Sequence, residues 1–187
     1  MTELAHAGLH HAETFWQGRR INKFSWDLGP IKDSIPGFVV GRVDQGGSDD
    51  AWNYFSIGAC DVEREGRHEF VLASPVESPR HVETLAMVAH AYTDPRQAVG
   101  LGRVLNLGQP WLEGSESAHL LVSVPYPFGP KLEWCRAPLG TIHYLWLLPI
   151  TASEAAYCEQ HGVEALEQRL EEREVNYLSP DRPSVVA

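Results

Sequence analysis

No stretch of this 187-residue sequence approaches the roughly 20 consecutive apolar residues that a helix needs to span a bilayer. Residues 1–11 also lack the basic start and the apolar run that are typical of a secretory signal. We therefore expect a cytoplasmic protein that does not bind membranes.

Cysteine is scarce as well. The three cysteines, Cys60, Cys135 and Cys158, are far apart in the sequence, and none belongs to a C-x-x-C motif. An odd and scattered set argues against both a disulfide framework and a structural zinc site. We expect buried or idle thiols.

Positive charge is in short supply. The sequence holds 15 lysines and arginines against 25 aspartates and glutamates, which gives a formal net charge of −10. This charge repels phosphate backbones and anionic lipids, so we expect no nucleic-acid partner. A basic protein would suit such a surface, although solubility alone can also explain the charge.

The common catalytic motifs are missing too. The sequence has no P-loop, no G-x-S-x-G elbow and no H-E-x-x-H pair. Gly100 and Gly102 lack the third glycine and the strand-turn-helix context of a dinucleotide site, which favours a turn. We therefore predict no enzyme activity, no metal and no cofactor.

One enzymatic alternative stays open, because the sequence has nine histidines. A metal-dependent or hydrolytic enzyme could draw on a scattered set of side chains: His68, Glu69, His90, His119, Cys135 and His143. None of them stands at a recognisable ligand spacing. Glu113, Glu116 and His119 could form a second such set, but Gly114 and two serines there suggest an exposed loop.

The first half of the sequence alternates strand and helix patterns. Residues 1–30 form an N-terminal segment whose apolar spacing suggests a short, weakly amphipathic helix before Asn22. Segments rich in β-branched and aromatic residues predict a hairpin of strands at 38–43 and 52–59 and a third strand at 68–73. Ser78 and Pro79 mark the start of a helix that Pro95 should end.

The second half predicts a central strand and two further helices. Residues 120–124 alternate as a half-buried strand does, and residues 141–148 are apolar on both faces, as expected of a strand between two layers. Thr151 and Glu154 form a capping box for a helix to about residue 160, Gly162 allows a break, and a second helix follows to about residue 174. Residues 176–187 should form an irregular tail. The whole chain, 1–187, is predicted to be a single α+β domain with a mixed β-sheet packed against helices.

Four large aromatic residues lie beside turn-forming glycines and prolines: Trp111, Tyr126, Phe128 and Trp134. Aromatic side chains on stiff loops are common anchors of binding surfaces, because they bury much area for little lost rotamer freedom. Alternatively, they plug the ends of the sheet. The sequence leaves both interpretations open.

A stripe of acidic residues marks the second C-terminal helix. Residues 151–174 hold seven glutamates and two arginines, a net charge of −5. At about 100° per residue, the helix aligns one set of glutamates away from both arginines: Glu164, Glu167, Glu171 and Glu174. Like charges at this spacing cost roughly 0.2–0.5 kcal/mol each, so helix stability does not explain them. The stripe is either solvated surface or a contact surface for a basic partner.

Several strings, taken as a set, resemble the suppressor of fused-like domain. They are WNYFSIGA (52–59), HEF (68–70), LGRVLNLGQPW (101–111), LLVSVPY (120–126), GPKLEW (129–134) and YLWLLPI (144–150). The resemblance runs from about residue 36 to residue 186. The string NLGQPW (106–111) is similar to the stand-alone bacterial form of the domain.

The resemblance implies a non-catalytic protein-binding domain. The animal protein of this family binds Gli-type transcription factors with a second domain and a disordered loop that 187 residues do not accommodate, so Gli binding is not transferred. Bacterial members are similar to immunity proteins of polymorphic toxin systems. From this family we expect an immunity protein or antitoxin that neutralises a partner toxin, such as a basic one, by binding it.

Overall fold

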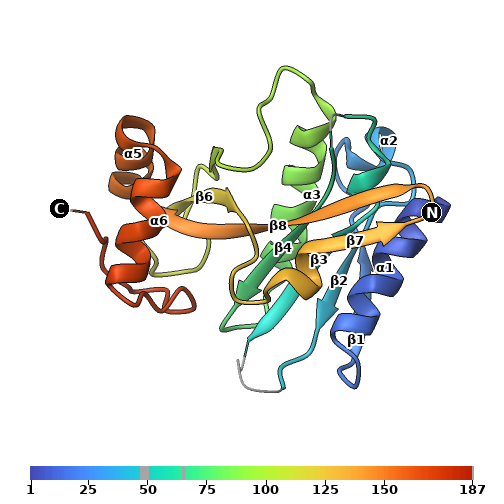
Figure 1. Cartoon of the computed structure of the whole chain (residues 1–187), viewed down its shortest axis with the longest axis horizontal. Coiled ribbons are helices and arrows are strands. Elements are labelled where there is room, and N and C mark those ends of the chain that lie inside the picture. The colour runs from blue at the N-terminus through green and yellow to red at the C-terminus, as the bar shows by residue number, and fades with distance from the viewer. Residues whose placement is uncertain (47–50, 65, 187) are drawn as a thin grey trace.

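The computed structural model describes residues 1–46, 51–64 and 66–186 (Figure 1). Eight strands form one mixed sheet in the order β1-β2-β3-β4-β8-β6-β5, and β7 pairs with β8 off this path. The strands are β1 (Ile21–Ser25), β2 (Val39–Val43), β3 (Trp52–Ile57), β4 (Arg67–Ser74), β5 (Val104–Asn106), β6 (Ser117–Ser123), β7 (Trp134–Ala137) and β8 (Gly140–Thr151). The α+β class and the mixed sheet are therefore confirmed.

Helices cover both faces of this sheet. They are α1 (Glu3–Phe15), α2 (Ile31–Ser34), the 3-10 helix η1 (Ala59–Asp61), α3 (Pro79–Thr93), α4 (Pro130–Glu133), α5 (Ala152–His161) and α6 (Val163–Glu172). In Figure 1, α1 lies at one end of the molecule and α5 and α6 lie at the other. No helix within the described ranges combines the length and apolar character that a membrane crossing requires.

β8 is the central strand, as its two apolar faces predict. It runs parallel to β4 on one side and antiparallel to β6 and β7 on the other. Leu145 and Leu147 point into a core that α3 covers, together with Phe70 of β4. The alternate side chains face the opposite way, because successive residues of a strand alternate. Tyr144 packs beneath α1 and Trp146 beneath α5 and α6.

The two predicted helices of the first half are present. Thr2 caps α1 by accepting a hydrogen bond from the Ala5 amide, and Gly8 allows α1 to lie against β8, where the Tyr144 hydroxyl donates to the Gly8 carbonyl at 2.8 Å. Ser78 caps α3, Pro79 occupies its first turn, and the helix ends at Thr93. Both helices follow from caps and apolar spacing.

The predicted hairpin and third strand are β2, β3 and β4. Gly41 of β2 lies against Phe55 of β3, where a Cβ atom would approach the ring to 2.3 Å, so this strand pair depends on a glycine. Residues 47–50, which lie between β2 and β3 in the sequence, are outside the described residues.

Three strands were not predicted: β1, β5 and β7. Each is short and pairs at the margin of the sheet, where only half of its side chains need to be apolar. β6 begins at Ser117, earlier than predicted, because a register shift between Ser117 and His119 lets polar residues pair with the end of β8. Ladder hydrogen bonds, which leave no hydrophobic pattern, define these elements.

The C-terminal helices form as predicted, with one difference. The capping box of Thr151 and Glu154 opens α5, and Gly162 separates α5 from α6 at a φ of 89°. α6 ends at Glu172 rather than near Glu174, because the chain turns into the left-handed region at Glu174, where φ is 47°. Glu174 therefore leaves the acidic stripe.

The C-terminal tail has no helix or strand over residues 176–186, yet it is packed into the core. Arg182 is only 8% exposed and holds the buried Glu154 carboxylate with two hydrogen bonds of 2.7 and 2.8 Å. The Val185 amide donates to the same carboxylate at 3.0 Å. Burial alone would raise the pKa of Glu154, but the hydrogen bonds from Arg182 and from two backbone amides lower it below its usual value.

Arg182→Ala should destabilise the protein strongly, because it leaves the Glu154 carboxylate buried without a counter-ion. Breaking one partner of a buried pair costs about 3–5 kcal/mol of unfolding free energy, which urea denaturation measures. The double variant Glu154→Gln, Arg182→Ala should lose less than the sum of the two single variants. An Arg182→Ala protein that unfolds at the parent's urea midpoint would show that the tail is not anchored by this pair.

His81 makes the stability depend on pH. It is buried on α3, bonds the Ser74 hydroxyl at 2.8 Å, and burial lowers its pKa from 6.5 to about 4. The unfolded chain therefore binds a proton that the folded chain excludes, and stability falls as the pH drops from 6.5 to 4. Replacing His81 with Asn should reduce this acid loss by on the order of 2 kcal/mol in urea titrations at pH 7 and pH 4.5. Equal losses in both proteins would contradict the assignment.

Candidate functional site

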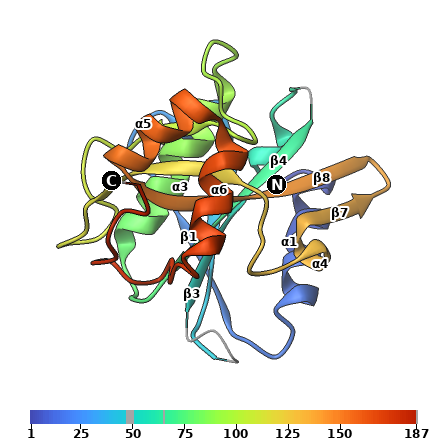
Figure 2. The same ribbon diagram turned by 60° about the vertical axis from the view of Figure 1, so that its left-hand side comes forward.

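A groove of about 570 Å³ lies between α6 and the segment that follows β6, with β8 beneath it. In Figure 2, α6 lies across the sheet and the segment from β6 to α4 runs beside it. The floor and one wall are mainly apolar: Trp146, Leu148, Leu170, Val175 and Tyr177. The floor thus combines the central strand, α6 and the tail that Arg182 anchors.

Three glutamates of α6 form the rim of this groove: Glu164, Glu167 and Glu171. They are the members of the predicted stripe that fall within the helix. Glu174 lines a different hollow, beside the tail. The structure therefore brings three carboxylates to the edge of an apolar groove rather than to an open, solvated helix face.

Glu167 is fixed in place from the opposite side of the groove. The Ser123 hydroxyl donates to one of its carboxylate oxygens at 2.5 Å, and the Tyr126 hydroxyl lies 3.5 Å from the other. Partial desolvation of the hydroxyl, which lies beside Glu167 while the ring stays exposed, raises the pKa of Tyr126, and the carboxylates of Glu167 and Glu171 act in the same direction. Tyr126 is 64% exposed and presents its ring at the mouth of the groove.

The neighbouring arginines do not neutralise this rim. Arg169 points to the other side of α6, where it lies over the Tyr157 ring at 4.9 Å and donates to the Tyr157 hydroxyl at 2.9 Å. Arg173 lines the hollow beside the tail. Among the described residues that line the groove, none is basic.

The remaining predicted aromatic residues lie elsewhere. Trp134 is 46% exposed and stacks on His143 with ring centroids 3.9 Å apart, at the far end of β8. Phe128 is half-buried and packs against Phe15 and Trp16 of the α1 region. Tyr126 is thus the one of the four aromatic residues that the groove includes.

Trp111 is buried, which contradicts the interpretation of this residue as an exposed aromatic anchor. It is only 3% exposed, its indole N–H donates to the Ser115 hydroxyl at 3.0 Å, and its ring faces His81 at 5.9 Å. Trp111 thus packs against the first turn of α3, and the alternative of a structural plug holds for this residue.

Two histidines of the enzymatic alternative, His68 and His143, lie side by side on β4 and β8 with ring centroids 5.9 Å apart, and the other members of the set make separate contacts. His90 on α3 hydrogen bonds with Ser34 at 3.0 Å, and His143 hydrogen bonds with Glu133 at 3.1 Å. His119 lies in β6, and Cys135 is buried in β7. Within residues 1–46, 51–64 and 66–186, no group of three or more such side chains is arranged to hold a metal.

Glu69 is buried, and its carboxylate accepts hydrogen bonds that stabilise the local fold. It accepts hydrogen bonds from the Ser56 hydroxyl, the Gly58 amide at 2.8 Å and the Cys60 amide at 3.3 Å. These donors come from β3, from η1 and from Gly58 between them, so Glu69 organises this turn. Burial raises its pKa to about 7, although the hydrogen bonds act in the opposite direction.

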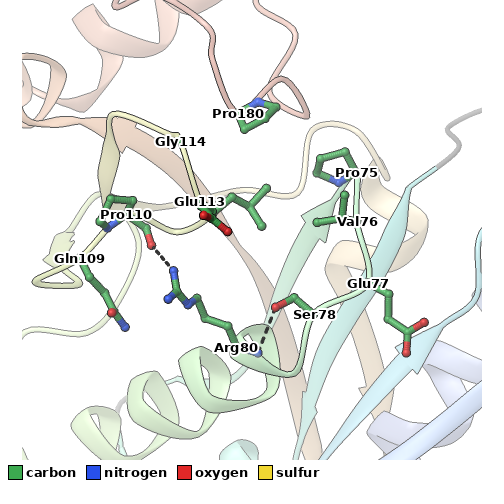
Figure 3. A pocket seen from close by; sticks show the side chains of 11 residues that line it. Pro75, Val76, Glu77, Ser78, Arg80, Gln109, Pro110, Glu113, Gly114 and Pro180 are labelled. Carbon is green, nitrogen blue, oxygen red and sulfur yellow. Dashed lines mark hydrogen bonds between the residues drawn. The ribbon is translucent and has the colours of Figure 1, made fainter.

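A second hollow, of about 670 Å³, lies at the start of α3 (Figure 3). Its basic residue, Arg80, already donates to the Pro110 carbonyl at 3.0 Å. Glu77 pairs with Arg42, and Glu113, one of the proposed acid-base residues, lies on the hollow's exposed rim. The hollow therefore lacks the concentrated charge and the aromatic floor of the α6 groove.

The fold and its central motifs define a known class. A model of the family described as suppressor of fused protein (SUFU) matches residues 33–183, so the chain belongs to the suppressor of fused family. The solved structure of a suppressor of fused homologue from Neisseria gonorrhoeae FA 1090 is similar to this chain, with a TM-score of 0.87. The two sequences are 37% identical, and the match covers 98% of this chain and 97% of that chain. The family expected from the sequence strings is confirmed.

Two more distant structures share the fold. The Sufu–Fu complex matches at 13% identity over 97% of this chain and 91% of that chain, with a TM-score of 0.72. Drosophila Suppressor of Fused matches at 12% identity over 95% of this chain and 50% of that chain, with a TM-score of 0.75. A search of curated proteins finds no match.

Trp111→Ala should destabilise the protein by about 3–5 kcal/mol, because it removes a buried indole and leaves a cavity beside His81. Thermal or urea unfolding checks this expectation. A variant that keeps the parent's stability would show that the indole can leave its site without cost, and the structural assignment would be wrong.

Proposed function

We propose that this chain is a non-catalytic protein-binding domain and that it contacts its partner through the α6 groove. The observation that carries the proposal is the juxtaposition of three uncompensated carboxylates with an apolar, aromatic floor. Such a surface offers both buried contact area and charge selectivity. The complex of a distant relative, Sufu with Fu, is consistent with protein binding.

The charge of the rim selects the kind of partner. Carboxylates beside a low-dielectric floor attract a positively charged surface, speed its encounter at low salt and repel acidic competitors. The chain as a whole carries a formal charge of −10, which acts in the same direction. We therefore propose a basic protein as the partner.

We further propose that the partner is a toxin and that this chain acts as its immunity protein. An immunity protein neutralises its toxin by occupying a functional surface, and many toxin surfaces that bind nucleic acid are basic. The bacterial resemblance described above and the acidic groove support this role for the chain. No catalytic step is required of it, since binding alone blocks the partner.

The test changes the rim without changing the fold. Glu164, Glu167 and Glu171 are replaced with glutamine, and the purified variant and parent are used in parallel to recover a basic partner from the native cell. Association of that partner is then measured by stopped flow at several salt concentrations. We expect association to slow by roughly tenfold and its salt dependence to flatten, with little change in melting temperature.

A matched control separates the groove from net charge. Glu63, Glu116 and Glu159 are exposed and lie outside the groove, so replacing them with glutamine removes the same charge elsewhere. This control should keep most of the parent's association rate. If both triple variants slow equally, net charge rather than the groove governs the encounter, and the proposed site is wrong.

A further inference from the structure

Besides its acidic rim, the groove has a second unusual feature, the indole N–H of Trp146. The Trp146 side chain lines the groove floor and is only 4% exposed. Its indole Nε1 is buried and has no hydrogen-bond acceptor among the described residues. A buried donor without an acceptor is costly, so native proteins rarely keep one.

The neighbours of Trp146 leave this donor without an acceptor among the described residues. Trp146 is paired in β8 opposite Ser123, yet the Ser123 hydroxyl, which donates to Glu167, accepts no hydrogen bond from the Trp146 indole. Tyr177 covers Trp146 edge-on, with ring centroids 5.0 Å apart, and packs against it as an apolar surface. A segment seated in the groove can therefore bring an acceptor to this indole.

The rim adds a requirement for positive charge in the same segment. Glu167 is already oriented by Ser123 and Tyr126, and Glu171 follows one helical turn later on the same side of α6. Residues four apart on a helix are neighbours, so one cation can interact with both carboxylates. The exposed ring of Tyr126 provides a flat aromatic surface beside them.

We propose that the groove binds an arginine-containing segment of the partner, with the guanidinium between Glu167 and Glu171 and a main-chain carbonyl of the segment accepting the Trp146 N–H. This inference rests on the proposed function and specifies its chemistry. Arginine fits better than lysine, because a planar guanidinium can bond carboxylates in pairs and stack on an aromatic ring while its stem covers apolar floor.

A capped tripeptide with arginine between two leucines is the probe, and its lysine and citrulline counterparts are the comparison peptides. Citrulline keeps the shape of arginine without its charge. Binding is followed by the indole N–H signals of 15N-labelled protein, of which the six tryptophans give one each. The Trp146→Phe variant identifies the relevant signal by its loss.

The arginine peptide should shift the Trp146 signal in a saturable manner and leave the signal of Trp134, at the other end of β8, unchanged. We expect its affinity to exceed that of the lysine peptide by about threefold and that of the citrulline peptide by about tenfold. Trp146→Phe and Glu171→Gln should each weaken binding by about fivefold. Trp134→Phe is the matched tryptophan control and should bind the peptide as the parent does.

Two results would overturn the arginine anchor: no saturable shift of the Trp146 signal, or equal affinities for the arginine and citrulline peptides. If the rim variant still impairs binding of the natural partner in either case, the groove remains the contact surface and only its proposed occupant is wrong. If the rim variant has no effect on that partner either, the proposed function fails together with the anchor.

Discussion

The buried ion pair between Glu154 and Arg182 is the interaction on which the C-terminal half of this domain depends. Glu154 does two tasks, since its carboxylate completes the capping box of α5 at the Thr151 amide and receives the Arg182 guanidinium. Arg182 also donates to the Pro149 carbonyl at 3.0 Å, which ties the tail to the end of β8. Because removing one partner leaves the other buried without a counter-ion, loss of either residue should weaken the contacts among strand, helix and tail.

This anchor has a direct consequence for the site. The chain between α6 and Arg182 contributes Val175 and Tyr177 to the groove, and Tyr177 packs edge-on against Trp146. One rim carboxylate, that of Glu167, is held independently by Ser123 at the end of β6 and by Tyr126 in the segment that follows. The floor and Glu167 are thus preorganised by contacts outside α6, and preorganisation reduces the entropy lost on binding.

Sequence patterns predicted the parts of this molecule that local rules govern. The capped helices α3 and α5, the hairpin of β2 and β3, and the central strand β8 follow from caps and from apolar periodicity. β1 and β7 were missed because ladder hydrogen bonds at a sheet margin leave no such periodicity. The acidic stripe of α6 was visible from helical spacing, whereas its position beside Trp146 and Tyr177 depends on long-range packing. The two interpretations of Trp111 stayed open for a similar reason, because a turn-rich neighbourhood does not reveal whether the chain turns outward or, as here, into the core.

In the proposed complex, the partner occupies the groove beside α6. Hydrogen exchange of the domain, alone and in complex with its partner, tests this claim most directly, because exchange reports protection along the whole backbone. A partner in the groove should add protection in α6, in residues 123–127 and in residues 173–177, and should leave α1 and α3 unchanged. Protection confined to β7 around Trp134, or to the start of α3 beside Arg80, would place the partner on another surface and contradict binding in the α6 groove.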